Sequence, residues 1–498
     1  MPVINIIDEN KMKLKKNMIV ILFLIFGLTK NLEADIIYAA SCSQEDVQAA
    51  IDLANDGDIV IVPAGTCTWD SAVSFYKSIT VQGAGIDSTI IIDSTPGYPT
   101  WEQTPFWISG STGKTFRITG FTFKDTRTSD PNGIIKIIGH NNTFRIDHVK
   151  FDDILNRGIW IKGRSYGVID HNIFVKETDD NFVAIHIEDD VIMVDETEDS
   201  WSRPMSYGTA EAVYIEDNTF DYDYHNFGTD CQMGGRYVFR YNIVNGTTVG
   251  NHGYNSVASS CLQEEIYNNI FNPPEGVSVY RAIQFRGGTG VIFNNTITGD
   301  YTHAIHVTNY RSCSDGFYPG KGPCDGTSPE DGNTPPDSVN HGWPCYDQIG
   351  RGTNQESYPL YEWDNAINGQ DADIEVYDAG SETCYTTIHI QEGRDYYNDT
   401  PMPGYTPYTY PHPLVTGIEE SEKLKTVLPL AFNVVPNPFT FYAAAPGYEK
   451  SQFAVYDVAG KRVGIYRGNR IGEELPAGVY FVMDKAKNAM PMLIVKVR

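Results

Sequence analysis

A short phrase that recurs through the middle of the chain constrains its fold more than any other feature. The pattern is an apolar residue, two polar residues, an asparagine, any residue and a second apolar residue. Two earlier copies lack the asparagine. The copies are ITGFTF (118–123), IDHVKF (146–151), IDHNIF (169–174), IEDNTF (215–220), FRYNIV (239–244), IYNNIF (266–271) and IFNNTI (292–297).

The spacing of these copies predicts a solenoid. Their last residues, called the anchors below, are Phe123, Phe151, Phe174, Phe220, Val244, Phe271 and Ile297. Successive anchors are 28, 23, 46, 24, 27 and 26 residues apart, and because 46 is twice 23 we expect two repeats in that interval. The runs are too short and too β-branched for helix pairs. One rung per repeat, with strands stacked ~4.8 Å apart, gives an all-β, parallel β-helix.

The recurrent asparagine has a physical role in such a fold. Asparagine tolerates a left-handed backbone and bonds to its own turn. Asparagines stacked at one corner of successive rungs can also form a hydrogen-bonded ladder along the axis. We expect this ladder to contain Asn172, Asn218, Asn242, Asn269 and Asn295. An ordinary β-sandwich would explain the strands but not their spacing.

The charge of the chain limits its partners. Its 498 residues include 64 acidic and 37 basic side chains, which gives a net charge of −27. A general nucleic-acid binder needs a basic face, so we expect no nucleic acid as a partner. An acidic polysaccharide stays possible, because a local cationic cleft can lie on an acidic protein.

The N-terminal region and the cysteines indicate export. Four lysines precede the apolar run 18–28, which has the length of a signal peptide and is short for a membrane span. We assign residues 1–40 to this region, with cleavage after Ala34 or Ala40, and expect a secreted or surface-attached mature chain without a membrane span. The eight cysteines contain no CxxC pair, so they are read as disulfides. The expected pairs are Cys42–Cys67 and Cys231–Cys261, while the pairing of Cys313, Cys324, Cys345 and Cys384 is open.

Residues 43–55 are predicted to form an amphipathic helix. Ser43 can cap its first turn, with Asp46 completing a capping box. Its apolar face has the helical spacing of Val47, Ala50, Ile51 and Ala54. Because exposed edges of a β-helix invite aggregation, we expect this helix to cover the N-terminal end of the solenoid.

Most of the chain before the C-terminal region resembles a known superfamily. The run VQAAIDLANDGDIVIVPAGTCTW (47–69), followed by ITVQGAG (79–85) and the asparagine phrases, is similar to the pectin-lyase-like right-handed parallel β-helix proteins. The resemblance covers residues 41–415 and implies that fold for them. The superfamily includes polysaccharide lyases, glycoside hydrolases, esterases and phage depolymerases, so it does not fix the reaction.

A second domain is expected at the C-terminus. Residues 416–426 form a polar linker, and residues 427–498 contain four predicted strands, at 432–439, 453–466, 475–482 and 492–498. The phrases PNPF, VYDVAGK and LPAGVY and the basic end resemble the C-terminal sorting domain of type IX secretion. The resemblance implies a small β-sandwich that binds the type IX secretion machinery and attaches the protein to the cell surface.

Any catalytic site must come from stacked rungs, because the chain contains no HExxH, Walker A or GxSxG motif. Residues eight to ten positions after an anchor are expected to form one strip over four consecutive rungs. These residues are Asp230, His252, Tyr254, Arg281 and His306. An ordinary polar ladder on a solvated face is the alternative interpretation.

The strip suits β-elimination on a polymer that contains uronic acid. This reaction needs a cation to neutralise the sugar carboxylate, a base for the C5 proton and an acid for the leaving oxygen. We expect Arg281 to bind the carboxylate, His252 to act as the base and Tyr254 as the acid. Asp230 and His306 are expected to bind substrate, with further cations from Arg236, Arg240 and Arg286.

Two further clusters were considered as sites. His140, Lys162 and Arg164 can form a second catalytic group, a sugar subsite or plain surface. A dense group of carboxylates can bind calcium or form a solvated acidic loop. The group contains Glu188, Asp189, Asp190, Asp195, Glu196, Glu198 and Asp199.

The best single interpretation is an exported polysaccharide lyase, with calcium as a candidate cofactor. The first alternative is a glycoside hydrolase of the same fold. An inverting hydrolase needs two carboxyl groups about 6.5–9.5 Å apart, which Asp190 and Asp230 can supply. The segment GNHG (250–253) also faintly resembles the GHG phrase of polygalacturonases. The second alternative is a surface protein that binds carbohydrate without cleaving it.

Overall fold

The computed structural model divides the chain into two compact units, Met1–Val415 and Thr416–Arg498. The described residues of the first unit are 34–96, 104–110, 112–126, 133–178, 182–190, 200–223, 227–253, 259–308, 347–377 and 386–415. Those of the second are 416–417, 442–445, 450–457, 461–484 and 492–496. Residues 1–33 of the predicted signal region 1–40 lie outside them, and the signal peptide stays a prediction. Among the described residues, no helix is both long and apolar enough to cross a membrane.

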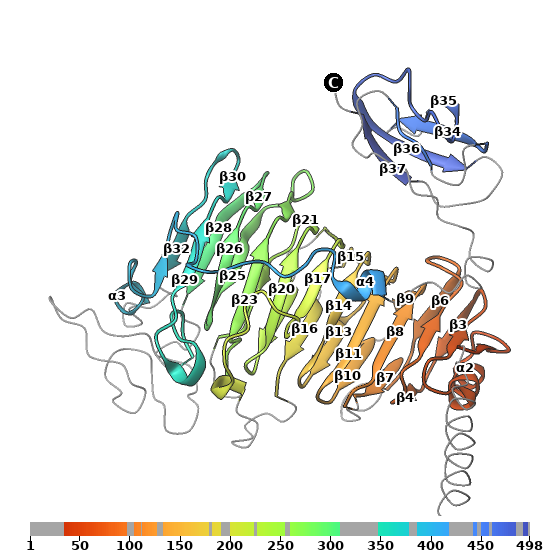
Figure 1. The fold of residues 1–498 in the computed structure, drawn as a ribbon, viewed down its shortest axis with the longest axis horizontal. Helices are drawn as coiled ribbons and strands as arrows, with labels where there is room; N and C mark the ends of the chain where they lie inside the picture. Colours follow the sequence, from red (N-terminus) through yellow and green to blue (C-terminus); the bar gives the residue numbers. More distant parts are fainter. Residues whose placement is uncertain are drawn as a thin grey trace, which may run out of the picture. The chain divides into compact units, whose positions relative to one another are not determined.

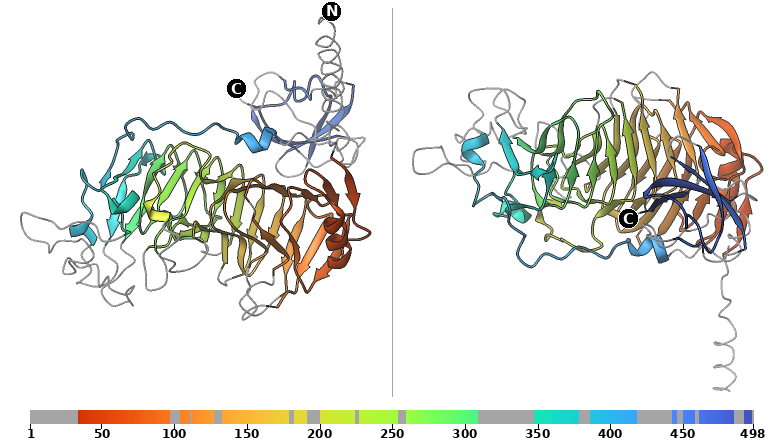
Figure 2. Two further views of the ribbon diagram at one scale, coloured as in Figure 1. Left: turned by 60° about the horizontal axis from the view of Figure 1, so that its bottom comes forward. Right: turned by 90° about the horizontal axis from the view of Figure 1, so that it is seen from above.

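The first unit is a parallel β-helix with three faces, as predicted (Figures 1 and 2). The first face, sheet A, has twelve strands, and each pairs in parallel with the equivalent strand of the next rung. Its strands are β1 (Ile36–Tyr38), β2 (Ile59–Ile61), β5 (Thr80–Gln82), β8 (Thr115–Thr119), β11 (Asn142–Asp147), β14 (Ser165–Asp170), β17 (Val213–Glu216), β20 (Arg236–Arg240), β23 (Gln263–Tyr267), β26 (Thr289–Phe293), β29 (Leu360–Trp363) and β33 (Tyr396–Tyr397).

The second face, sheet B, has eleven strands and ends in one antiparallel pair. Its strands are β3 (Gly65–Trp69), β6 (Thr89–Asp93), β9 (Thr122–Asp125), β12 (Lys150–Asp152), β15 (Ile173–Lys176), β18 (Thr219–Tyr222), β21 (Ile243–Asn245), β24 (Ile270–Phe271), β27 (Thr296–Ile297), β30 (Ala366–Ile367) and β31 (Gln370–Asp371).

The third face consists of two sheets that follow one another along the axis. Sheet C contains β4 (Val73–Phe75), β7 (Phe106–Ser109), β10 (Ile135–Ile138), β13 (Asn156–Lys162), β16 (Phe182–Glu188) and β19 (Phe227–Gln232). Sheet D contains β22 (Val249–Gly250), β25 (Val279–Phe285), β28 (Tyr301–Thr308) and β32 (Ile374–Tyr377). A bridge between Phe227 and Thr248 joins the two sheets. The candidate site lies at this junction.

All seven anchors occupy equivalent positions in sheet B. Each anchor pairs with the next, from Phe123–Phe151 to Phe271–Ile297. Their side chains fill the bore, where Phe151, Phe174 and Phe220 stack with ring centroids 4.7 and 4.9 Å apart. Such stacking adds to the hydrophobic stabilisation of the core.

The expectation of two repeats in the 46-residue interval is wrong. Phe174 of β15 pairs directly with Phe220 of β18, so the interval contains one rung. The additional residues lie between β16 and β17, in a connection that includes the short helix η1 (Ser200–Ser202). A loop inserted between two faces lengthens the repeat without shifting the register of the strands.

The asparagine ladder is present and is one residue longer than predicted. The backbone amide of each asparagine donates to Oδ1 of the asparagine on the next rung, at 2.9–3.1 Å, and the ladder ends on Asn365. The left-handed residue is not the asparagine but the one before it, such as His171 and Asp217. The asparagine instead uses its amide to satisfy the backbone of the turn, as in the bond from Asn218 Nδ2 to the Glu216 carbonyl (2.9 Å).

The predicted helix covers the N-terminal end of the solenoid. Helix α2 spans Gln44–Leu53, and the Ser43 side chain accepts the backbone N–H of Asp46. Its apolar residues pack into the solenoid core. Both predicted disulfides are present, Cys42–Cys67 and Cys231–Cys261. The cysteines at 313, 324, 345 and 384 lie outside the described residues.

Residues 405–415, called the return segment below, run back across the outer face of sheet A (Figure 1). They lead into helix α4 (Pro413–Gly417). The two remaining short helices of this unit are η3 (Thr353–Gln355) and α3 (Thr386–His389). Arg240 of β20 donates to the carbonyls of Tyr408 and Thr409 at 2.8 and 2.9 Å, and the backbone amide of His412 donates to Glu216 at 2.7 Å. The return segment therefore covers charged groups that would otherwise face water.

The second unit contains one antiparallel sheet in the order β35-β34-β36-β37. Its strands are β34 (Gln452–Asp457), β35 (Arg462–Arg467), β36 (Gly478–Asp484) and β37 (Met492–Lys496). Its core includes Phe453, Val455 and Val482. The predicted strand at 432–439 lies outside the described residues, and the likeness to a type IX sorting domain stays a prediction.

Candidate functional site

The candidate site lies on the outer face of sheets C and D, where polar side chains alternate with core residues. In β16, Ile185 and Ile187 fill the bore, while His186 and Glu188 belong to the opposite face. This alternation follows from the two-residue period of a β-strand. His186 pairs in register with Asp230 of β19, and Glu188 pairs with Gln232.

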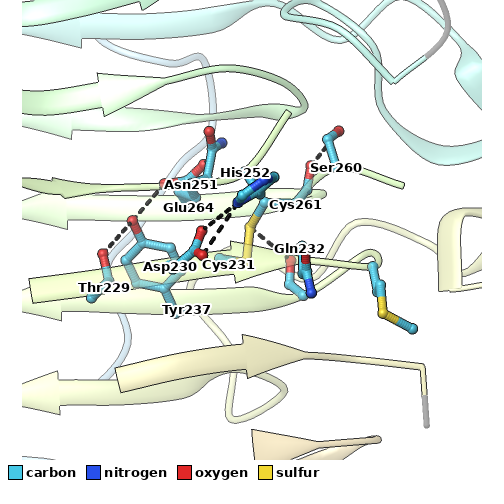
Figure 3. The surroundings of a disulfide bond; sticks show 12 residues. Thr229, Asp230, Cys231, Gln232, Tyr237, Asn251, His252, Ser260, Cys261 and Glu264 are labelled. Carbon is cyan, nitrogen blue, oxygen red and sulfur yellow. Dashed lines mark hydrogen bonds and ion pairs between the residues drawn. A yellow bond between two sulfur atoms is a disulfide. The ribbon is translucent and has the colours of Figure 1, made fainter. Parts of the chain in front are cut away.

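The centre of the site is the pair formed by Asp230 and His252. Nδ1 of His252 lies 3.1 and 3.2 Å from the two carboxylate oxygens of Asp230 (Figure 3). Burial disfavours the ionised form of Asp230. The charges of His252, His186 and Arg286 outweigh this effect and hold the pKa of Asp230 well below its usual range. In its neutral form, His252 can donate its Nδ1–H to the ionised Asp230, and Nε2 is then the nitrogen of the ring that can take up a proton.

The disulfide Cys231–Cys261 fixes the loop that carries His252. The backbone N–H of His252 donates to the carbonyl of Cys231 at 2.7 Å, and the N–H of Cys261 donates to the carbonyl of His252 at 3.3 Å. His252 is therefore held between the two bonded cysteines, which Figure 3 shows beside Asp230. The cross-link limits how far the ring can move from the carboxylate.

A second carboxylate lies next to this pair. Glu188 accepts a hydrogen bond from Gln232 at 2.6 Å, lies 2.9 Å from Nε2 of His186 and forms an ion pair with Lys162 at 3.0 Å. Burial raises the pKa of Glu188, but the hydrogen bond and charge of His186 and the charge of Lys162 lower it to about 2. Glu188 and Asp230 are therefore both ionised at neutral pH.

Arginines from the next rungs supply positive charge. Arg286 donates through Nε to the carbonyl of Asn251 at 2.7 Å, one residue from His252. The charge of Arg286 lowers the pKa of Asp230. Burial and the charge of Arg286 also lower the pKa of Arg281. Burial and the charge of Arg281 in turn lower the pKa of His306 to about 4. The described residues thus form a chain of interactions that runs from the Asp230–His252 pair through Arg286 and Arg281 to His306.

Two of the predicted sugar-binding residues are placed elsewhere. Arg236 and Arg240 belong to β20 of sheet A, a different face of the rung. Arg240 is fully buried and forms an ion pair with Glu216 at 2.6 Å. Arg236 is buried against the connection after β16, donating to the Pro204 carbonyl and the Ser206 hydroxyl at 2.8 Å. The prediction that these arginines contact sugars is therefore wrong, because the chain itself covers them.

The other predicted residues have mixed outcomes. Tyr254 lies outside the described residues, so its assignment as the acid stays a prediction. Of the second cluster, Lys162 joins the candidate site through Glu188. Arg164 donates its backbone N–H to Nδ1 of His140 at 3.1 Å, so these two residues support a turn.

The described carboxylates of the acidic segment have partners within the chain, and calcium binding there stays a prediction. Glu188 is bound by Lys162 and His186, Asp189 forms an ion pair with Arg203, and Asp190 accepts the Ser200 hydroxyl at 2.7 Å. Residues 191–199 lie outside the described residues. In the described part of the chain, the ligand oxygens of Glu362, Asp373 and Asp399 lie within 4.8 Å of one another. Oxygen ligands of this kind suit calcium, but Glu362 already accepts hydrogen bonds from Asn365 and from the Asp399 backbone.

A buried carboxyl group supports the site from inside the bore. Tyr237 donates to Glu264 at 2.5 Å, and the amide of Asn251 donates to the other carboxyl oxygen (Figure 3). Asn251 Oδ1 accepts the backbone N–H of Arg286 at 2.6 Å. Burial raises the pKa of Glu264 to about 8. This network fixes Asn251, the residue between β22 and His252.

We expect Glu264 to make the stability of the protein depend on pH. The folded state keeps a proton on Glu264 between its ordinary pKa, near 4.5, and about 8. The stability that the folded state gains by keeping this proton on Glu264 is therefore lost as the pH rises through that range. Urea unfolding at pH 5 and pH 8 should show that Glu264→Gln gains stability relative to the wild type at the higher pH. An equal difference at both pH values would contradict the assignment.

Sequence reasoning missed His186, Gln232 and Glu264. His186 and Gln232 lie in strands between anchors, and the wrong count of rungs in the 46-residue interval hid the position of β16. The available signal was the strand FVAIHIE (182–188), in which polar residues interrupt an apolar run at alternate positions. Glu264 lies in β23, and the offsets counted from the anchors do not reach its strand.

Comparisons with known proteins leave the chain without an assigned family. No protein-family model and no curated protein matches it. Among solved structures, it is similar to an alginate lyase from Paenibacillus sp. str. FPU-7, with 12% identity over 69% of this chain and 98% of that one and a TM-score of 0.35. It is also similar to the catalytic domain of a GH87 alpha-1,3-glucanase in complex with nigerose, with 12% identity over 75% and 69% of the two chains and a TM-score of 0.27. Values this low assign no activity to the chain.

Proposed function

We propose that this protein is an exported lyase that cleaves a uronic-acid polysaccharide by β-elimination. The observation that carries the proposal is the Asp230–His252 pair, with the charge of Arg286 acting on Asp230 and on Arg281 of the neighbouring sheet. The two disulfides are typical of a protein that works outside the cytoplasm. The C-terminal unit is proposed as its type IX sorting and attachment domain.

The proposed reaction assigns one role to each group. Arg281, with Arg286, binds the sugar carboxylate and stabilises the negative charge that develops there when the C5 proton is removed. Nε2 of His252 takes this proton, and Asp230 stabilises the resulting imidazolium. The electron pair forms the C4–C5 double bond as the C4–O bond breaks. The leaving oxygen takes a proton, which we assign to Tyr254.

The ionisation of Glu188 and Asp230 supports elimination over acid-assisted hydrolysis by these two carboxylates, while Asp190, the other carboxylate of the hydrolase alternative, accepts the Ser200 hydroxyl. An inverting hydrolase needs one carboxyl group that is protonated and can act as the acid. The hydrogen bonds and charges around Glu188 and Asp230 keep both groups ionised. Neither is suited to protonate a glycosidic oxygen at neutral pH.

The mass of the products distinguishes the reactions. Elimination should give fragments with an unsaturated non-reducing end that are lighter by one water than the corresponding hydrolysis products. Mass spectrometry of digests of pectic, alginate and other uronic-acid polymers, with and without calcium, measures this difference. Fragments with saturated ends only would replace the proposal by hydrolysis. Binding without new ends on any polymer would favour a carbohydrate-binding surface protein.

A further inference from the structure

Sheet D contains a concentrated group of buried polar atoms that have no hydrogen-bond partner among the described residues. Gln284 of β25 pairs in register with His306 of β28, and both side chains are 2–3% exposed. The unpartnered atoms include Oε1 of Gln284, both ring nitrogens of His306, Nε of Arg281 and Oγ1 of Thr308. A buried polar group without a partner costs about 1–3 kcal/mol. Five such atoms on two neighbouring strands are expected where a ligand supplies the missing bonds.

Exposed aromatic rings surround His306. The ring centroids of Tyr280 and Tyr377 lie 5.4 and 5.5 Å from that of His306, and His303 lies 5.2 Å away. The two tyrosines are 41% and 48% exposed. Large exposed aromatic side chains that flank a few buried polar groups are a common composition of a ligand site.

We propose that Tyr280, Tyr377, Gln284 and His306 form a saccharide subsite, with Arg281 shared with the reaction centre. A sugar ring stacks on the tyrosines, and its hydroxyl and carboxylate oxygens bond to the polar groups beneath. This assignment deepens the function proposed above and rests on it for the identity of the polymer. In this arrangement the polysaccharide runs along the solenoid axis toward the C-terminal end of sheet D.

The position and chemistry of the subsite agree with this direction. From β22, which precedes His252, to β28 there are two strand spacings, or about 10 Å. That is sufficient for sugar units beyond the bond that is cleaved. His306 is neutral at neutral pH, because burial and the charge of Arg281 lower its pKa to about 4. A neutral imidazole can donate one hydrogen bond to a hydroxyl group and accept another.

The test compares tyrosine variants in binding and in turnover. The full-length wild type, Tyr280→Ala, Tyr377→Ala and the double variant are run in gels that contain sodium polygalacturonate, sodium alginate or dextran. The control is Tyr38→Ala, an exposed tyrosine on β1 of sheet A (62% exposed). Each single variant should bind the acidic polymer that the wild type binds about 2–10-fold more weakly than the wild type and the control do. In turnover, the loss should appear in KM for the polymer and leave kcat within about twofold.

The outcomes separate this inference from the proposed function. Weaker binding by the tyrosine variants without cleavage by any form would support the subsite and refute the lyase. Elimination with unchanged KM and binding in both variants would support the lyase and overturn the subsite. Wild-type protein that binds neither acidic polymer, or binds dextran equally well, would also overturn it.

Discussion

Replacing His252 with alanine is expected to lower kcat on the uronic-acid substrate by about 10²–10⁴-fold, the usual contribution of a general base. The variant should fold normally, because the neighbouring backbone is held by the hydrogen bonds to Cys231 and Cys261. Asp230→Asn should also lower kcat, since an amide cannot stabilise the imidazolium as a carboxylate does. Initial rates of double-bond formation measure both effects.

A matched histidine variant controls for nonspecific damage. His148 forms a comparable pair with Asp147, at 2.8 Å, but its half-exposed side chain follows β11 of sheet A. His148→Ala should therefore keep the wild-type rate. If His252→Ala retained more than a tenth of the wild-type kcat, His252 would not be the base. Equal losses in the two variants would indicate a stability effect instead.

Replacing Arg240 with methionine is expected to lower the free energy of unfolding by about 3–5 kcal/mol, because it leaves a buried charge unpaired. Arg240 and Glu216 are both fully buried and lie 2.6 Å apart. Arg240 also donates to two carbonyls of the return segment, so their hydrogen bonds are lost as well. Urea unfolding of the full chain, followed by circular dichroism, measures the change.

An exposed ion pair provides the comparison for Arg240. Lys124 and Asp152 lie 2.7 Å apart on sheet B, and the lysine side chain is 48% exposed. Lys124→Met should cost at most about 1 kcal/mol, as is usual for surface pairs. A double variant that also replaces Glu216 with leucine should lose less than the single variants combined, since no charge is left alone. A similar loss for Arg240→Met and Lys124→Met would show that the buried pair does not stabilise the fold.

Local patterns predict those features that depend on the repeat itself. Each rung buries the same positions, so a period in the sequence becomes a register in space, and the anchors pair rung by rung; the exception is Phe174, which pairs directly with Phe220 where a further rung was expected. The helix at residues 44–53 follows from its cap and apolar face. The disulfides follow from cysteines near neighbouring rungs. Offsets from the anchors also predict that Asp230, His252 and Arg281 lie on one face, because rungs of similar length keep a constant phase.

Features that depend on distant segments could not be predicted. The burial of Arg240 is produced by residues 168 and 169 positions later, which no local pattern links to it. The insertion between β16 and β17 has nearly the length of a rung, so counting residues alone mistook it for one. The support from Glu264 crosses from sheet A to the loop at His252, and periodicity along one face contains no information about such a contact.

The most direct measurement is the ultraviolet absorbance of unsaturated uronates while the purified protein is incubated with a panel of acidic polysaccharides. We predict a rise on at least one polymer that is absent with His252→Ala and retained with His148→Ala. New reducing ends without this absorbance, or a rise that persists undiminished in His252→Ala, would contradict the assignment of β-elimination to this face of the solenoid.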